Sequence, residues 1–307
     1  MIRRPPRSTL SPSSAASDVY KRQGKSTLGL SILNLVPSPG YIKEGEIIYY
    51  GNGKEINILK LSDEELRKFR WKEISMVFQS ALNALNPVLR IWDQLYDTIQ
   101  SHDSKISKKE AYQKAEYLLS MVRLDPKRVL KSYPHELSGG MRQRVMIAMS
   151  LLLNPKILIL DEPTTALDIL TQKNIIELLK QIRKEMGLTL IFITHDLSLA
   201  AELADRVAVM YAGSLVEVGP VYNIFYNAKH PYTYALIKTV PKISSADEEL
   251  YPIPGSPPDM INLPPGCKFH PRCLYTQQIC KEKEPKLEKA EDYHWVACHR
   301  WRELKFK

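Results

Sequence analysis

The chain has no long hydrophobic run and no internal repeat, and each absence excludes a class of protein. It holds 307 residues, and its longest apolar stretch, residues 145–153, is interrupted by Ser150, whereas a membrane-spanning helix needs roughly 18 apolar residues. Hydrophobic residues make up 44% and charged residues 25% of the chain, which excludes global disorder and a collagen-like repeat. We therefore expect a soluble chain, or a peripheral membrane subunit, large enough for two packed domains.

Cysteine is absent from the first 266 residues, and the basic residues do not gather on one element. A chain of this length does not need disulfides for stability, so the late cluster of four cysteines predicts a local site rather than a framework. The formal net charge is +9, but five basic residues lie within positions 1–23 against the single acid Asp18. The rest of the chain is only mildly basic, and we expect no nucleic-acid partner.

Residues 1–23 lack the pattern of a strand, a helix or a secretory signal. They are rich in Ser, Arg and Pro, a composition that also occurs in mitochondrial presequences. The segment is most similar to a translated sequencing adapter fused to a gene fragment. We therefore expect residues 1–23 to be non-native and disordered, and the native N-terminus to be truncated.

The next four residues form the second half of a phosphate-binding loop, G-x-x-x-x-G-K-[ST]. They are Gly24, Lys25, Ser26 and Thr27. The first glycine of the motif would stand at Val19, and no apolar strand precedes it. In such a loop the lysine reaches the β- and γ-phosphates and the serine ligates Mg²⁺. A plain helix start with a serine cap explains four residues about equally well.

Strand-like and helix-like segments alternate from residue 24 to about 225, which predicts an α/β fold. Apolar runs predict buried strands. Apolar residues at helical spacing that end at Gly187 predict a helix. Two strand-like segments on either side of Ala212-Gly213 predict a hairpin. The expected strands are 74–78, 157–160 and 188–194, the helix covers 175–186, and the hairpin strands are 206–211 and 214–218. A helix-rich insertion with helices at 107–122 and from Ser138 onward separates the first two strands.

Two acids follow the strand at 157–160. Asp161 can hold Mg²⁺ through water, and Glu162 can polarise the water that attacks a γ-phosphate. The alternative is a pair of solvated acids at a strand end.

A second anion site is predicted at Ser138, Gly139 and Gly140, where a serine cap precedes two glycines at a helix N-terminus. The alternative is an ordinary capped helix, although two glycines lower helix stability and need a reason. Gln79 and His195 each follow an expected strand and indicate little when taken alone.

Together and in this order, these motifs closely resemble the ATP-binding subunit of an ABC transporter, over residues 24–307. The resemblance implies a P-loop NTPase (RecA-like) ABC ATPase core, truncated at its N-terminus, with a helical subdomain and a Pro- and Cys-rich C-terminal extension. It implies an ATP-binding domain at 24–225, with the helical subdomain at about 86–152, and an extension at 226–307.

The resemblance also implies roles for single residues. Gly24, Lys25, Ser26 and Thr27 would bind phosphate, and Ser26, Asp161 and Gln79 would serve Mg²⁺. Glu162, Gln79 and His195 would act on the attacking water or the γ-phosphate. The residues that would face the nucleotide of a second, identical or homologous ATPase subunit, or the dimer seam, are Ser138, Gly139, Gly140, Gln143 and Asp168.

Eleven of the 21 prolines fall at or beyond position 220, so we expect an extended, turn-rich tail there. Its cysteines, spaced C-x5-C-x6-C-x17-C, are Cys267, Cys273, Cys280 and Cys298. Four thiolates can hold an iron–sulfur cluster, which we favour as a 4Fe–4S site, or zinc. Free thiols remain the alternative, and His270 and His299 leave the ligand set open.

The tail resembles the C-terminal extension of oligopeptide/dipeptide importers. That resemblance implies an ATPase at the cytoplasmic face of the membrane, working with two transmembrane permeases and an extracytoplasmic solute-binding protein. Nickel and other solute importers share the layout. A DNA-repair or translation ATPase is disfavoured, because only 59 positions without a heptad stretch separate Gln79 from Ser138. An inactive fragment is the remaining possibility.

Overall fold

The computed structural model describes residues 23–51, 53–79, 84–165, 167–239 and 253–306. The chain divides into two compact units, Ser26–Thr194 and a unit of Met1–Lys25 with His195–Lys307, and each is described by itself. No helix among the described residues is long and apolar enough to cross a bilayer. Of the segment 1–23 that was predicted to be disordered, residues 1–22 lie outside the described residues, and the predicted domain boundary at residue 225 stays a prediction.

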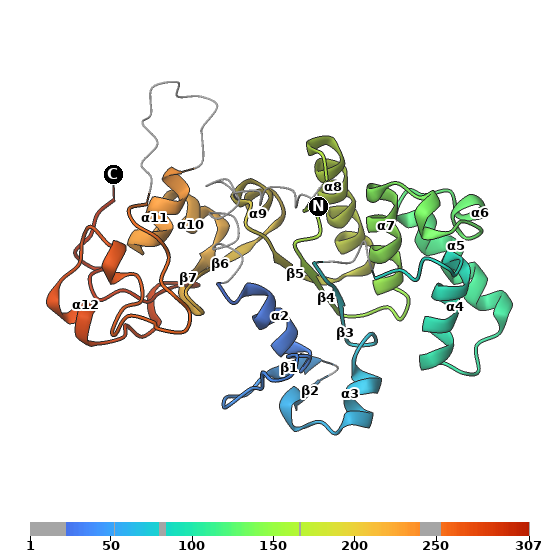
Figure 1. The fold of residues 1–307 in the computed structure, drawn as a ribbon, viewed down its shortest axis with the longest axis horizontal. Helices are drawn as coiled ribbons and strands as arrows, with labels where there is room; N and C mark the ends of the chain where they lie inside the picture. The colour runs from blue at the N-terminus through green and yellow to red at the C-terminus, as the bar shows by residue number, and fades with distance from the viewer. Residues whose placement is uncertain (1–22, 52, 80–83, 166, 240–252, 307) are drawn as a thin grey trace, which may run out of the picture. The chain divides into compact units, whose positions relative to one another are not determined.

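A three-stranded parallel sheet forms the centre of the Ser26–Thr194 unit, in the order β3-β4-β5 (Figure 1). Its strands confirm the three apolar runs as β3 (Ile74–Val77), β4 (Ile157–Asp161) and β5 (Thr189–Ile193). Leu158 and Leu160 point to one face and Ile159 to the other, and all three are completely buried. Burial on both faces explains why β4 is apolar throughout.

Helix α2 (Lys25–Ile32) packs closely on this sheet at Gly29. A Cβ at Gly29 would lie 3.0 Å from Ile193 Cδ1 and 3.3 Å from Met76 Cε, so a larger residue would require these side chains to shift. Just beyond the last residue of the helix, the carbonyl oxygens of Leu33 and Asn34 accept hydrogen bonds from Nε and Nη2 of Arg70, respectively. Contacts at both ends thus fix α2 against its unit.

The predicted helical insertion is present between β3 and β4. It consists of α4 (Ile91–His102), α5 (Lys108–Met121), the short α6 (Pro126–Val129) and α7 (Gly139–Ser150). Ser107 and Glu110 form a reciprocal capping box at the start of α5, and Ser138 caps α7. After β4, α8 (Ile169–Met186) ends at Gly187 in the left-handed conformation, as the glycine predicts.

The sequence analysis missed an antiparallel hairpin and a helix ahead of β3. The hairpin pairs β1 (Ile48–Gly51) with β2 (Lys54–Asn57), and α3 is Asp63–Phe69. Strand β2 carries two charges in four residues, which hides it from a search for apolar alternation. The capping box of Ser62 and Glu65 that begins α3 was readable in the sequence.

The second unit contains a four-stranded antiparallel sheet in the order β6-β7-β9-β8. Helix α9 (Leu197–Leu203) precedes this sheet in the chain. The predicted hairpin is confirmed as β6 (Arg206–Tyr211) and β7 (Ser214–Pro220). Both turn residues, Ala212 and Gly213, have positive φ, as a two-residue hairpin requires.

The C-terminal tail is more than the extended, turn-rich segment that its prolines predicted. It adds β8 (Glu288–Glu291) and β9 (His294–Val296) to the sheet, with β9 paired to β7. Three short helices, α10 (Val221–Tyr226), α11 (Pro231–Lys238) and α12 (Gln278–Glu282), belong to the same unit. Tyr211, Tyr232 and Phe269 form an aromatic core with ring centroids 4.7–5.3 Å apart, so the tail and the hairpin share one core.

A buried carboxylate joins the hairpin to the tail. Glu217 on β7 and His294 on β9 are both fully buried, with Glu217 Oε1 2.8 Å from His294 Nε2. Glu217 also accepts hydrogen bonds from the backbone N–H groups of Lys229 (2.6 Å) and His230 (3.1 Å). One side chain therefore ties together three segments of this unit.

We expect the stability of this unit to fall in mild acid because of His230. Burial lowers the pKa of His230 to about 4, although nearby Glu217 raises it. In the unfolded chain the His230 imidazole takes up a proton near pH 6.5, whereas in the folded chain it does so only near pH 4. The free energy of unfolding is therefore unaffected by His230 above pH 6.5, and it falls by up to about 3 kcal/mol as the pH is lowered from 6.5 to 4. Urea unfolding measured from pH 8 to pH 4 checks this. A His230→Asn variant, which keeps a side-chain cap for α11, should have a flatter profile, and an unchanged profile would contradict the assignment.

Candidate functional site

Two buried acids stand at the carboxyl end of the central strand. Asp161 is the last residue of β4 and is 3% exposed, while Glu162 follows it and is 6% exposed. The Glu162 N–H donates to the carbonyl oxygen of Ile193 at the end of β5 (2.9 Å), and its φ is +47°. The alternative of two solvated acids is therefore wrong, because both side chains are held inside the unit at the edge where α/β proteins bind ligands.

Two side chains donate hydrogen bonds to the carboxylate of Glu162. Gln79, two residues beyond β3, donates from Nε2 to Glu162 Oε2 at 3.0 Å. Thr165 donates from Oγ1 to the same oxygen, also at 3.0 Å. The structure thus places Gln79 in contact with Glu162, which directly follows Asp161, while their catalytic roles stay predictions. It adds Thr165, which was not predicted because a threonine after an acidic turn carries no distinctive pattern.

Gly140, near the start of α7, is required by close packing against helix α8. A Cβ at Gly140 would lie 2.8 Å from Thr171 Cγ2, and one at Gly139 would lie 3.7 Å from Leu167 Cδ2. Ser138 caps the helix by accepting from the N–H of Met141 at 3.3 Å. Gly140 therefore has a packing reason as well as the predicted one of bare backbone at a helix N-terminus, whereas a Cβ at Gly139 would make only an ordinary contact.

We expect Gly140→Ala to destabilise the Ser26–Thr194 unit by about 1–3 kcal/mol, since the new methyl group overlaps Thr171. Thr171→Ser removes only the methyl group in the way and keeps the hydroxyl. The double variant should therefore recover most of the loss, as thermal unfolding would report. A double variant no more stable than Gly140→Ala alone would contradict this packing.

Asp168 caps helix α8. Its carboxylate accepts from the N–H of Thr171 (3.0 Å) and from the Thr171 hydroxyl (2.6 Å), and these hydrogen bonds lower the pKa of Asp168. The next two residues, Ile169 and Leu170, are 81% and 75% exposed. Exposed apolar side chains directly after Asp168 agree with the expectation that this segment meets another subunit.

Gln143 lies inside the α7 packing rather than at its exposed start. It is 4% exposed, and its Nε2 has no hydrogen-bond partner among the described residues. Its predicted contact with nucleotide stays a prediction.

The phosphate-loop residues begin helix α2. Lys25, Ser26 and Thr27 form its first turn, and Gly24 before them has a φ of +88°, which favours glycine. Their backbone N–H groups thus lie at a helix N-terminus, where anions bind. Gly24 and Lys25 belong to the unit that also contains His195, so their placement together with Glu162 stays a prediction.

His195 stands two residues beyond β5 and directly before Asp196, which caps α9 by accepting from the N–H of Ser198 at 2.8 Å. The residue therefore follows a parallel strand, as the sequence predicted.

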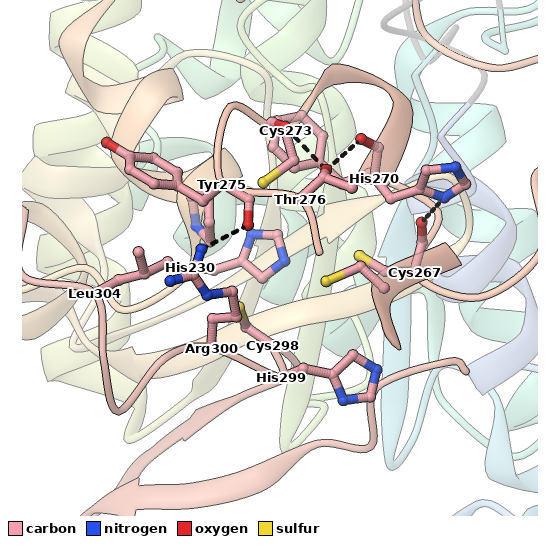
Figure 2. Close-up of a pocket in the computed structure, with 13 residues that line it drawn as sticks. His230, Cys267, His270, Cys273, Tyr275, Thr276, Cys298, His299, Arg300 and Leu304 are labelled. Carbon is pink, nitrogen blue, oxygen red and sulfur yellow. Dashed lines mark hydrogen bonds between the residues drawn. The ribbon is translucent and has the colours of Figure 1, made fainter. Parts of the chain in front are cut away.

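All four cysteines line one pocket of the second unit (Figure 2). Cys267, Cys273 and Cys298 are partly buried and Cys280 is buried, and none forms a disulfide. His230, His270, His299 and Arg300 line the same pocket. The C-x5-C-x6-C-x17-C spacing is thus brought to one place, as expected of a local site.

Two thiols of this pocket, those of Cys267 and Cys298, are hard to ionise. Burial, and secondarily the neighbouring cysteines, raise the pKa of Cys267 to about 11 and of Cys298 to about 12. A metal ion would offset the repulsion between such thiolates, so the donor set fits one by its chemistry. However, no three His, Cys, Asp or Glu side chains within the described ranges are arranged to hold a metal ion, and the iron–sulfur prediction is not confirmed.

Two family models match the chain. The model described as "ABC transporter" matches residues 23–165. The model described as "Oligopeptide/dipeptide transporter, C-terminal region" matches residues 216–280. The first range includes Gln79, Ser138 and Glu162, and the second includes the first three cysteines.

Curated relatives cover most of the chain. A dipeptide transport ATP-binding protein, DppD, of Caldanaerobacter subterraneus subsp. tengcongensis is 48% identical over 280 residues, which is 91% of this chain and 85% of the relative. An oligopeptide transport ATP-binding protein, OppD, of Bacillus subtilis is 47% identical over 276 residues, 89% of this chain and 76% of the relative.

Solved structures share the fold. The dimeric ATP-binding cassette MJ0796, in a post-hydrolysis state bound to ADP and Pi, has a TM-score of 0.55 at 34% identity and covers 65% of this chain and 81% of its own. The protein cbiO1 from Clostridium perfringens, part of the ABC transporter complex cbiONQ, has a TM-score of 0.54 at 29% identity over 66% of this chain and 75% of its own.

Proposed function

The chain belongs to the ABC transporter ATP-binding proteins that have an oligopeptide/dipeptide C-terminal region, and from this premise we propose that it powers the import of peptides across the cytoplasmic membrane. It is an ATPase that uses ATP and Mg²⁺. Two relatives named for dipeptide and oligopeptide transport, at 48% and 47% identity, support the peptide substrate.

The observation that supports hydrolysis most directly is Glu162, buried at the carboxyl end of β4 and bonded to Gln79. In the proposed mechanism Glu162 polarises the water that attacks the γ-phosphate, and Gln79 orients it. Asp161, Ser26 and Gln79 supply the oxygen donors that Mg²⁺ prefers. Lys25 and His195 stabilise the charge on the terminal phosphate, so catalysis is chiefly positioning and electrostatics.

A second subunit completes each nucleotide site in this proposal. Ser138, Gly139 and Gly140 present the N-terminus of α7 to the γ-phosphate held by the other ATPase, which is an identical or homologous chain. The dimeric state of the cassette MJ0796 supports this arrangement.

ATP binding closes the pair of ATPase subunits and hydrolysis reopens it. The motion passes to two transmembrane permeases through the region between Gln79 and Trp92. A solute-binding protein outside the membrane delivers the peptide, and the ATPase lies at the cytoplasmic face.

We propose also that Cys267, Cys273, Cys280 and Cys298 hold a metal, with a 4Fe–4S cluster favoured over zinc. Four thiols in one pocket of the tail support this. The group would crosslink three segments of the unit and take no part in hydrolysis. Iron, sulfide and zinc measured on protein purified without oxygen test the proposal, and less than one metal per chain would contradict it.

The transport proposal is tested in proteoliposomes. The chain is combined with its partner ATPase, permeases and solute-binding protein. We expect ATP hydrolysis to rise on addition of di- or oligopeptides, with peptide uptake. Stimulation by Ni²⁺ but not by peptides would favour a nickel importer, and no hydrolysis at all would overturn the proposal.

A further inference from the structure

We propose that Thr165 is a positioning residue that aims the carboxylate of Glu162 during hydrolysis. The inference rests on the proposed role of Glu162 as the residue that polarises water. No motif in the sequence singled out Thr165, and its role follows from the contacts around Glu162.

Thr165 holds Glu162 at two points. Its hydroxyl donates to Glu162 Oε2 at 3.0 Å, and its backbone N–H donates to the Glu162 carbonyl oxygen at 3.2 Å. The second bond closes a tight turn that begins at Glu162, whose φ of +47° is uncommon for a residue with a side chain. The hydroxyl therefore faces the carboxylate because the backbone of the same turn directs it there.

The loop that contains Thr165 is itself fastened to a long helix. Gln172 on α8 donates from Nε2 to the carbonyl oxygen of Thr164 (3.1 Å), which precedes Thr165, and to that of Leu167 (3.2 Å), two positions after Thr165. Leu167 N–H closes the loop on Thr164 at 3.3 Å. Thr165 thus presents a fixed donor, anchored through α8 rather than through its own side chain.

The two hydrogen-bond donors to Glu162, Gln79 and Thr165, lie on different segments of the chain. Gln79 follows β3 and precedes the segment proposed to meet the permeases, whereas Thr165 lies in the turn that follows Glu162 itself. A movement of Gln79 would remove one donor from Oε2 and leave the Thr165 bond intact. We infer that Thr165 keeps the carboxylate aimed while Gln79 exchanges its partner for water or Mg²⁺.

The test compares three variants in the full native chain. Thr165→Val replaces the hydroxyl with a methyl group of the same size, Thr165→Ala removes both, and Thr165→Ser keeps the hydroxyl. Thr98→Val is the matched control, since it removes another partly buried threonine hydroxyl bond, to the carbonyl oxygen of Gln94 (2.8 Å) on α4. The measurements are kcat, KM for ATP, ATP affinity by titration and the melting temperature.

A misplaced reacting group costs up to roughly 100-fold in rate. We therefore expect Thr165→Val and Thr165→Ala to lower kcat by about 10- to 100-fold with ATP affinity unchanged, Thr165→Ser to recover most of the rate, and Thr98→Val to match the parent. Parental kcat in Thr165→Val, or a serine variant no better than the valine one, would overturn the proposal.

A crystal structure of the parent and of Thr165→Val gives a readout that does not depend on turnover. The proposal expects the Glu162 carboxylate to rest against the Thr165 hydroxyl in the parent and to adopt another rotamer in the variant. An unmoved carboxylate would overturn the inference without affecting the proposed function. Conversely, a parent that never hydrolyses ATP would overturn the function, while the two crystal structures would still decide where Thr165 directs the side chain.

Discussion

Replacing Glu162 with glutamine should reduce ATP turnover by roughly 100- to 10,000-fold, the range attributed to a general base. Glutamine keeps an oxygen that can accept from Gln79 and Thr165, so the turn around residue 162 should keep its shape. It cannot take a proton from water, so hydrolysis stops after binding. Phosphate release under single-turnover conditions measures the loss, and a titration with ATP shows whether binding is retained.

The same variant should accumulate as an ATP-bound dimer, because the step that reopens the pair is blocked. Size-exclusion chromatography with light scattering, with and without Mg²⁺ and ATP, reports the change of mass. The Thr98→Val variant, remote from Glu162, serves as the control and should hydrolyse at the parental rate. A Glu162→Gln protein that turns over like the parent would show that another group activates the water.

Glu217→Ala should destabilise the chain by about 3–5 kcal/mol, the cost of removing one partner from a buried charged contact. The change leaves His294 Nε2 and the N–H groups of Lys229 and His230 without the acceptor that now satisfies them. Equilibrium denaturation gives the free energy, and hydrogen exchange of residues 206–220 locates the loss.

Two controls separate this buried contact from ordinary surface charge. Glu217→Gln keeps an acceptor oxygen and should cost less than Glu217→Ala. Glu291→Gln breaks the ion pair with Lys229, 2.9 Å long and partly exposed, and should cost less than about 1 kcal/mol. If Glu217→Ala proved no more harmful than Glu291→Gln, the tail would not depend on this carboxylate for its attachment to the hairpin.

The elements predicted correctly are those whose signals are local. The apolar run ending at Asp161 favours a buried strand, Gly187 favours a helix end and Ala212-Gly213 favours a tight turn, and each of these is formed. The tail strands β8 and β9 were missed because both are short and β8 is mostly charged. Strand β9 forms by pairing with β7 and β8 by pairing with β9, and the contact with β7 is a long-range one that no local pattern encodes.

The candidate site was predicted from motifs, and the physical detail came from the structure. Asp161 and Glu162 were recognised by their place after a strand, but their burial and the Gln79 bond are tertiary contacts. The packing of Gly140 against Thr171 depends on α7 and α8 meeting, and the Thr165 hydroxyl bond depends on the turn that begins at Glu162, so spacing alone could not reveal them. The cysteines were predicted to cluster, whereas their common pocket depends on how the tail folds.

The central claim is that ATP is clasped between two ATPase subunits, and one measurement tests it most directly: a crystal structure of the native-length Glu162→Gln protein with Mg²⁺ and ATP. The account predicts that each triphosphate is contacted by Lys25 and His195 of one subunit and by Ser138 of the other. A nucleotide bound with Ser138 remote from every phosphate would contradict it.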